Sequence, residues 1–244
     1  MTAIFPVTGR FSVPFAQDPS HTDPKQESPM YILHRLTDSA STIVEIVLHD
    51  LGLPYQTRTV DKSAGDLTSP AYLTLHPLGL VPVLETPDGP IFETAAILLY
   101  LSETPQAEGH HLAPAPGTPD RAAFLKWLFF TSSNLHPTLL QTFYPARTAG
   151  AENSEAVVTH AKAKLHVYLN LLNSVAETRP AYLSDTAPTL LGYYLAVLMR
   201  WIAPDFPSIN YPALHRMLAY LEQRPAVQAC AAAEGLGATP FTGS

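Results

Sequence analysis

The sequence contains a single cysteine, Cys230, among 244 residues. One cysteine excludes an intrachain disulfide, a CxxC redox pair and a zinc site with four cysteine ligands. Charged residues are also scarce, at 14%, whereas hydrophobic residues make up 46%. A chain of this length and composition can bury a substantial core in one large domain or two modest ones. Because Cys230 lies in the alanine-rich run VQACAAAEG, we expect an inert helix thiol.

Long basic and long apolar runs are missing as well. The 14 Lys and Arg against 21 Asp and Glu give a formal net charge of −7, which argues against nucleic acid as a partner. The longest apolar run, Thr189 to Met199, stops at Arg200, short of the roughly 18 residues that a membrane span needs. With no apolar signal core in the first 30 residues, we expect a cytoplasmic protein without a membrane partner. The ten histidines lack HExxH or comparable spacing, so no metal site is predicted.

Proline is abundant, and its distribution marks the predicted domain boundaries. The chain has 24 prolines, about twice the usual ~5% share. Five of them lie in residues 1–30, which show no sustained period. Another cluster, in TPQAEGHHLAPAPGTP, separates two helical patterns. The expected organisation is an extension at 1–29, a first domain at 30–106, a linker at 107–118, a second domain at 119–238 and a tail at 239–244.

The first domain alternates between the periods that distinguish strands from helices. MYILHRL is a β-branched and aromatic run, and STIVEIVLHDLGL places apolar residues at helical spacing. PYQTRTV alternates as a half-buried strand, and SPAYLTLHP opens with an N-cap serine and a proline at the first helical position. VPVLET, the turn PDG and IFE predict a hairpin, and TAAILLYLSE predicts an apolar helix. The predicted order is βαβαββα.

Beyond residue 119 every long segment has the 3.6-residue period, so the second domain is expected to be all helix. In the first domain, a βαβ unit followed by a hairpin and a helix is the thioredoxin-like arrangement. Its third strand begins at Pro82, which gives up a backbone donor. One explanation is an ordinary proline at the start of an edge strand. The other is a cis Val81-Pro82 bond that turns the Val81 backbone toward an extended peptide, pairing as an added strand does.

The sequence from residue 30 to residue 238 resembles the cytosolic glutathione transferase family. The family pattern NPxGxVPxLxxxDGxxLxESxAIxxYL corresponds here to HPLGLVPVLETPDGPIFETAAILLYL. The resemblance implies an α/β thioredoxin-like domain followed by an all-α helical domain. It also implies glutathione as co-substrate, a homodimer and a role in detoxification. The resemblance is to bacterial types, with the subclass unassigned.

The resemblance assigns the glutathione contacts to two short segments. Val81 and Pro82 would hold the cysteinyl unit, whereas Glu93 and Thr94 would hold the γ-glutamyl end. The residue types also suit these roles on physical grounds. N–H groups at a helix N-terminus with a hydroxyl among them bind a carboxylate, and Thr94 is expected to cap its helix. Glu93 can accept from the ligand's ammonium group.

The residue that activates the thiol is expected in the loop LTDSAS, residues 36–41. A free thiol titrates near pH 8.5, so the enzyme must favour the thiolate, which in the family a donor after the first strand usually does. Ala40 stands where the β-like class has cysteine, which disfavours that class. A one-residue loop difference would place Ser39 at the position of the serine-type classes. We take Ser39, with Ser41 and Thr37 as alternatives; helix capping is the competing explanation for each.

Two helix starts carry capping signals that can be compared with the usual patterns. Thr42 and Glu45 have the spacing of a capping box, so the loop has more hydroxyl groups than the helix start needs. In the second domain the family starts a core helix with a Ser/Thr-x-x-Asp box, but here Thr189 is followed three residues later by Gly192. The missing carboxylate and the glycine should each cost about 0.5–1 kcal/mol.

The acceptor pocket of the family lies between the first domain and the first helices of the second. It would be lined here by an apolar wall with one titratable group: Phe129, Phe130, Tyr144 and His136. A histidine before proline is also a common structural hydrogen-bonder. His76 and Leu80 replace the asparagine and the Lys or Gln common in the family, which predicts weaker glutathione contacts there.

Three functional classes remain open on the sequence. The first is a glutathione transferase that activates the thiol for attack on apolar electrophiles, or an isomerase, dehalogenase or peroxidase that uses the same thiolate. The second is a non-catalytic member that binds glutathione or a protein. Thiol-disulfide exchange through a cysteine of the chain is opposed, because no cysteine precedes residue 230. The fold alone does not choose among reactions.

Overall fold

The computed structural model describes residues 31–243, and the extension expected at 1–29 lies outside them. One four-stranded sheet has the order β2-β1-β3-β4. The strands are β1 (Tyr31–Arg35), β2 (Tyr55–Thr59), β3 (Val83–Thr86) and β4 (Gly89–Phe92). The helices among them are α1 (Ala40–Asp50), α2 (Pro70–Leu75) and α3 (Thr94–Ser102). This βαβαββα order confirms the predicted thioredoxin-like fold.

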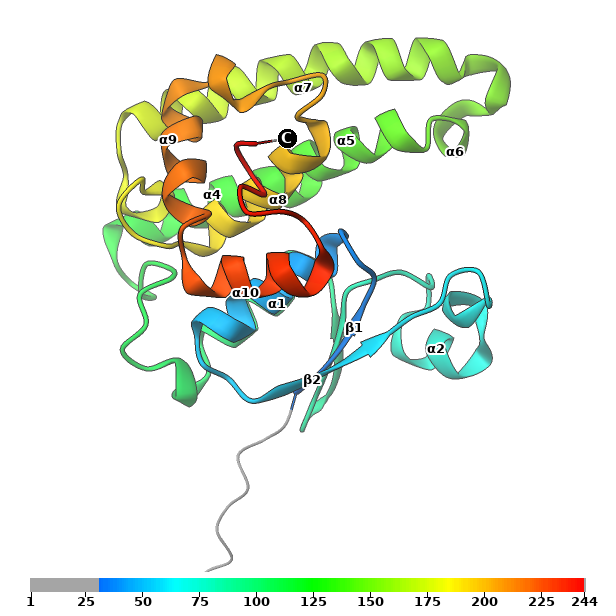
Figure 1. Cartoon of the computed structure of the whole chain (residues 1–244), viewed down its shortest axis with the longest axis horizontal. Helices are drawn as coiled ribbons and strands as arrows, with labels where there is room; N and C mark the ends of the chain where they lie inside the picture. The colour runs from blue at the N-terminus through cyan, green and yellow to red at the C-terminus, as the bar shows by residue number, and fades with distance from the viewer. Residues whose placement is uncertain (1–30, 244) are drawn as a thin grey trace, which may run out of the picture.

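Both faces of the sheet are covered. β1 runs parallel to β2 and antiparallel to β3, and β3 pairs antiparallel with β4. Because side chains alternate across a strand, Leu84 joins the main core while its neighbour Val83 joins a small cluster with Val60 and Tyr72. Helices α1 and α3 therefore pack together on one face of the sheet. Helix α2 lies on the other side of the strands from α1 (Figure 1).

The second domain is helical, as predicted. Its helices are α4 (Pro119–Phe130), α5 (His136–Phe143), α6 (Ala146–Ala149), α7 (Ser154–Glu177), α8 (Leu190–Ile202), α9 (Pro212–Leu221) and α10 (Pro225–Glu234). Short 3₁₀ turns lie at Asp66–Thr68, Pro105–Ala107, Ala151–Asn153, Ala181–Leu183 and Ser208–Asn210. A π-helical turn, Thr131–Leu135, joins α4 to α5. Within residues 31–243 no helix combines the length and the apolar character needed to cross a membrane.

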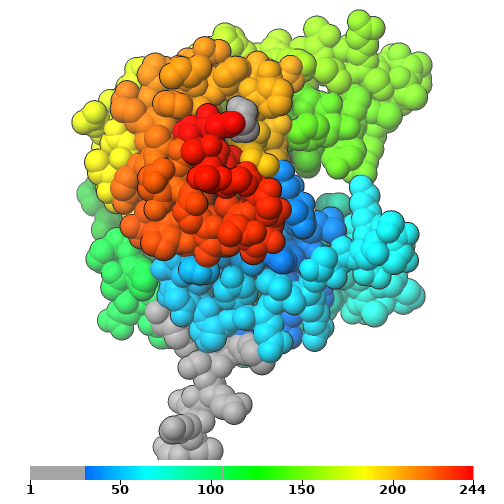
Figure 2. All heavy atoms as spheres, viewed as in Figure 1, coloured from blue at the N-terminus to red at the C-terminus, as the bar shows by residue number. Residues whose placement is uncertain are grey.

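The two domains share one hydrophobic core. It joins α1 and α3 of the first domain to α8 at the centre of the second. All but two of the 13 residues of α8 are buried, and the exceptions are Arg200 and Trp201. Helix α10 returns to pack beside α1 (Figure 1). Figure 2 shows the red C-terminal segment lying directly on the blue residues of the first domain.

The start of α8 explains the unusual glycine. The buried Thr189 hydroxyl accepts a hydrogen bond from the Gly192 N–H at 2.9 Å and so caps the helix without a reciprocal carboxylate. A Cβ added to Gly192 would lie 2.9 Å from Thr189 Oγ1 and 3.2 Å from Leu221 Cδ1. The glycine is therefore required by close packing around the cap.

We predict that Gly192→Ala lowers the free energy of unfolding by about 1–2 kcal/mol, because the methyl group displaces the cap, although alanine is ordinarily the better helix residue by ~1 kcal/mol. Urea unfolding measures this effect. Thr189→Ala should itself cost about 1 kcal/mol, and the double variant should cost less than the sum because the clashing oxygen is gone. A stabilised Gly192→Ala protein would contradict the packing argument.

Candidate functional site

A cleft of about 770 Å³ opens where the two domains meet. The loop after β1, the segment before β3 and the start of α3 form one side, and α5, α6 and α8 form the other. It is lined by most of the residues predicted from sequence: Ser39, Val81, Pro82, Glu93, Thr94, His136 and Tyr144. Four predicted residues do not line it: Thr37, Ser41, Phe129 and Phe130.

Ser39 is the N-cap of α1. Its hydroxyl accepts from the Ser41 N–H at 3.2 Å, and Thr42 Oγ1 accepts from the Ser39 N–H at 3.3 Å. These bonds form a capping box. The expectation that Thr42 and Glu45 form the box is therefore wrong, because the helix begins earlier and Glu45 pairs with Arg35 at 2.7 Å. Ser39 therefore both caps α1 and lines the cleft.

The other two hydroxyl candidates occupy different environments. Ser41 is fully buried, and its Oγ accepts from the Leu36 N–H at 3.2 Å and donates to the Leu36 carbonyl at 3.0 Å. Ser39 Oγ lies 2.7 Å from the same carbonyl and 2.7 Å from Ser41 Oγ. Thr37 is exposed. Because Ser41 also donates to the Leu36 carbonyl, the Ser39 hydroxyl can turn its proton toward the cleft without leaving that oxygen unpaired.

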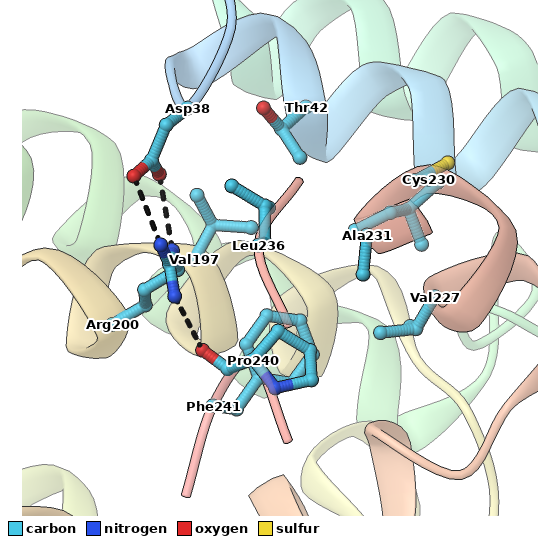
Figure 3. A pocket seen from close by; sticks show the side chains of 11 residues that line it. Asp38, Thr42, Val197, Arg200, Val227, Cys230, Ala231, Leu236, Pro240 and Phe241 are labelled. Atoms are coloured by element: carbon cyan, nitrogen blue, oxygen red, sulfur yellow. Dashed lines mark hydrogen bonds and ion pairs between the residues drawn. The ribbon is translucent and has the colours of Figure 1, made fainter. Parts of the chain in front are cut away.

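Asp38 joins this loop to the second domain through hydrogen bonds. Its carboxylate accepts from Arg200 Nε at 3.2 Å, from Arg200 Nη2 at 3.1 Å and from Trp201 Nε1 at 2.9 Å. Figure 3 shows the two Arg200 contacts and a third bond from Arg200 to the Pro240 carbonyl. Asp38 has φ of 49°, a left-handed conformation that Asp tolerates better than most residues. Sequence reasoning missed this contact, since the partners lie 162 residues apart.

Behind the loop, Glu234 of α10 binds the backbone of the same turn. One oxygen, Oε2, accepts from the Asp38 N–H at 2.8 Å and from Thr42 Oγ1 at 2.9 Å. Desolvation raises the pKa of Glu234 despite these bonds. The hollow in Figure 3 measures about 10 Å³, room for one water at most. Burial raises the pKa of the adjacent Cys230 thiol to about 12, so it stays protonated at neutral pH.

Val81 presents an open backbone to the cleft. The Val81-Pro82 bond is cis, which is the second of the two explanations offered for Pro82. Within residues 31–243 neither the N–H nor the carbonyl of Val81 has a hydrogen-bond partner, because the β1 ladder starts at Val83. The preceding Leu80 carbonyl accepts from the Tyr72 hydroxyl at 2.8 Å, which fixes the approach to the strand. A half-buried donor and acceptor at one residue suit an extended peptide.

The start of α3 is open in the same way. Glu93 occupies the N-cap with φ of 72°, and no side chain caps the helix. The expected cap by Thr94 is absent, since Thr94 is already the first helical residue and is buried. The first N–H groups of α3 are therefore left for another acceptor, which is the condition under which a helix start binds a carboxylate.

Polar groups of α3 and of the second domain line the same cleft. Thr94 and Tyr194 both line it, and the Tyr194 hydroxyl is 3.0 Å from His136 Nδ1. Burial lowers the pKa of His136 to about 4 and raises that of Tyr194. Both groups are thus neutral near pH 7. His136 lines the cleft as a neutral hydrogen-bonding group held by Tyr194.

The second-domain wall of the cleft differs from the apolar wall expected for an acceptor pocket. Tyr144 lines it, together with Leu140 and Phe143. Phe130 instead packs edge-on against Trp127 and Tyr168, and Phe129 is half exposed outside the cleft. Three basic residues that the sequence reasoning missed also line the cleft: Lys62, Arg147 and Arg200. A helical pattern alone does not show which of two adjacent aromatic residues points into a pocket.

His76 lines the first-domain side of the cleft. It is buried, its ring packs on Phe92 at 4.5 Å between centroids, and its Nδ1 accepts from the Leu78 N–H at 3.2 Å. Burial lowers its pKa. The ring therefore has a packing role at the position where the resembling family has asparagine. Within residues 31–243 no three His, Cys, Asp or Glu side chains cluster as metal ligands would.

Asp38→Asn should lower the free energy of unfolding by about 1–2 kcal/mol, because asparagine keeps the left-handed backbone but loses the charged contacts to Arg200 and Trp201. Hydrogen exchange at Ser39 should accelerate. Asp205→Asn, which breaks the exposed 2.6 Å pair with Lys162, is the matched control and should cost at most ~1 kcal/mol. Equal effects of the two variants would show that the Asp38 contact does not order the loop.

The low pKa of His136 predicts an acid-sensitive contribution to stability. Between its unfolded value near 6.5 and its folded value of about 4, only the unfolded chain binds the proton. The stability advantage of wild type over His136→Asn should therefore shrink as pH falls from 6.5 toward 4. Urea titrations at several pH values measure it, with exposed His160→Asn as control. An advantage independent of pH would exclude a buried neutral histidine.

Known proteins share this architecture. The family model for the N-terminal domain of glutathione S-transferases matches residues 39–104. Glutathione S-transferase GST-4.5 of Xanthomonas campestris is 30% identical over 210 residues, covering 84% of this chain and 98% of the relative. A probable elongation factor 1-gamma of Arabidopsis thaliana is 38% identical over 77 residues, and the match covers 18% of its length.

Solved structures agree with the sequence relatives. A sphingomonad glutathione S-transferase complexed with glutathione is 30% identical, with a TM-score of 0.70, covering 84% of this chain and 100% of that one. A glutathione transferase homologue from Sulfitobacter with bound glutathione is 25% identical, with a TM-score of 0.73, covering 85% and 99%. Together with the full-length match to the Xanthomonas protein, these findings establish that the chain belongs to the glutathione S-transferase family.

Proposed function

We propose that the protein is a glutathione transferase that binds glutathione in the cleft and activates its thiol for attack on apolar electrophiles. The observation that carries the proposal is the convergence on one cleft of two open backbone sites, at Val81 and at the uncapped start of α3, with the Ser39 hydroxyl. Relatives crystallised with glutathione support it. The cysteinyl unit would pair with Val81, next to Pro82, and the γ-glutamyl end with Glu93 and Thr94.

Ser39 would act as a hydrogen-bond donor to the sulfur. Its position before α1 adds the partial positive charge of a helix N-terminus, so both the hydroxyl and the helix favour the thiolate. Ser41 would keep the Leu36 carbonyl paired while Ser39 turns. The thiolate then forms a carbon–sulfur bond with the electrophile, whose leaving group departs with its bonding electrons. The thiol proton passes to solvent.

The reaction class within this chemistry is open to isomerisation, dehalogenation or peroxide reduction. A non-catalytic binding protein is the second candidate. It is favoured by the three hydrogen bonds that already occupy the Ser39 hydroxyl, and by the elongation factor 1-gamma relatives, whose names denote a translation factor. The transferase is preferred because the Xanthomonas relative matches along almost its whole length.

We further propose a homodimer in the cytoplasm, with detoxification as its role. Helix α3 is apolar on nearly every face, but much of that surface is already buried within the chain. The exposed Ala96 and the half-exposed Leu99 and Tyr100 are the apolar residues that it leaves for a second subunit. Light scattering should give twice the 26.5 kDa of one chain; a monomer would exclude this assembly.

Ser39→Ala should raise the pKa of bound glutathione by one or two units and slow conjugation at pH 7 by roughly ten- to a hundredfold. Glutathione binding should change little, because the peptide is held at Val81 and Glu93. Ultraviolet titration of the bound thiolate measures the shift. Since Ser39 also caps α1, Ser39→Thr serves as the variant that keeps both hydroxyl and cap.

Ser41→Ala and Thr37→Val complete the series. Thr37→Val should leave the titration unchanged, because Thr37 lies outside the cleft. Ser41→Ala should shift it less than Ser39→Ala. If glutathione bound to wild type and to every variant titrates at the pKa of the free thiol, and no electrophile reacts, the binding protein becomes the better description.

Glu93→Ala and the isosteric Glu93→Gln should each weaken glutathione binding by roughly tenfold, because a charge-assisted bond to the ammonium group is lost. Retention on glutathione resin and calorimetry measure the loss. Glu155→Gln, an exposed acid in the first turn of α7, controls for the change in net charge. Retention equal to wild type would move the γ-glutamyl end elsewhere.

A further inference from the structure

Two basic side chains from different domains converge on one aromatic ring of the cleft. In α6, the Arg147 Cζ lies 4.0 Å from the centroid of the Tyr144 ring. Lys62, in the loop after β2, places its Nζ 5.7 Å from the same centroid. All three residues line the cleft. Figure 2 shows the cyan segment after β2 rising toward the green helices of the second domain beside a hollow.

No carboxylate of the described chain neutralises these two cations. Within residues 31–243 neither Lys62 nor Arg147 has an Asp or Glu oxygen within 4.0 Å, whereas Arg200, the third cation of the cleft, is paired with Asp38. The acid next to Lys62 in sequence, Asp61, is bound elsewhere. Its Oδ1 accepts from the Ser63 N–H, the Ser63 hydroxyl and the Ala64 N–H, so it closes its own turn.

The two charges are close enough to influence each other. Since both lie within the quoted distances of one centroid, they are separated by no more than about a Debye length, ~10 Å at 0.1 M salt. Two like charges at this spacing repel, and an anion between them relieves the repulsion. The chain has an excess of acids, with a net charge of −7, yet no acid of residues 31–243 pairs with these cations at the cleft.

An apolar surface adjoins them. Leu140, Phe143 and Tyr144 line the cleft with 39%, 48% and 40% of their area exposed, which is enough to receive a flat hydrophobic body. A molecule that satisfies both features has an aromatic or otherwise apolar part on this wall. It also has an acidic group that reaches Lys62 and Arg147 beside the Tyr144 ring.

We propose that the electrophile accepted by this cleft carries a carboxylate or sulfonate, bound between Lys62 and Arg147. The inference rests on the proposed glutathione transferase function and specifies its acceptor. The acidic group takes no part in the bond changes: the glutathione sulfur bonds to the electrophilic carbon, and the leaving group departs with its electron pair. The two cations orient the acceptor so that this carbon faces the sulfur.

A matched pair of acceptors tests the proposal. A chlorodinitrobenzoate, with the acid para to chlorine, is compared with its uncharged amide, each rate being divided by its uncatalysed rate with glutathione. We expect kcat/KM to favour the benzoate by roughly tenfold and the preference to decline with added salt. Lys62→Met and Arg147→Met should each lower kcat/KM for the benzoate by about threefold relative to the amide, and the double variant by about tenfold.

Charge-conserving and remote variants control for folding and net charge. Lys62→Arg and Arg147→Lys should keep most of the preference. Lys164→Met, which removes an exposed lysine from α7, should keep all of it. If the benzoate and the amide react equally well in wild type, the acidic acceptor is excluded while the transferase stands. If the methionine variants instead raise KM for glutathione, the cations serve a glutathione carboxylate and the proposal is overturned.

A binding measurement decides the case in which no acceptor reacts. Dinitrobenzoate and dinitrobenzamide, which have no leaving group, quench the fluorescence of Trp201 on binding in the cleft. Tighter binding of the benzoate, lost in the double variant, would support the acid site even if the transferase proposal failed. Equal affinities would overturn the acid site.

Discussion

The contact of Asp38 with Arg200 and Trp201 is the interaction on which the arrangement of the cleft depends. It joins the loop that carries Ser39 to the two residues of α8 that are not buried. The opposite side of the same turn is bound by Glu234 of α10. The loop is thereby fixed from both sides by helices of the second domain. The candidate thiol donor belongs to the first domain in sequence, but its position is set by the second.

The two proposed ligand regions are treated differently by the chain. Around Val81 and α3 the protein supplies unpaired backbone groups and neutral hydroxyls, which suit a peptide. Around Tyr144 it supplies apolar side chains with two cations at the rim. His136, kept neutral by burial, also lines the cleft and adds no charge to either region. The lining of this one cleft thus changes from polar groups near Val81 to apolar side chains and cations near Tyr144.

Local patterns were sufficient for the strand and helix order, and the family resemblance favoured the cis bond that the structure has at Pro82. These features depend on short segments whose residues are close in sequence. The helix starts were harder to predict. Thr42 and Glu45 have the spacing of a capping box, but Glu45 pairs with Arg35 instead. Thr94 was expected to cap α3, but the left-handed Glu93 occupies the N-cap position. The pair of cations at Tyr144 could not be predicted from the sequence, because Lys62 and Arg147 approach the same ring only through the packing of the two domains.

The single core shared by both domains limits how such a chain can diverge. Helix α1 is packed against its own sheet, α8 and α10, so few of its positions can change without a matching change some 150 or more residues away. Recombination that exchanged only the helical half with a distant relative would replace the surface against which α1 folds. Variation in the acceptor is therefore expected to accumulate at the cleft rim, where Lys62 and Arg147 are exposed, while the buried junction is inherited as one unit.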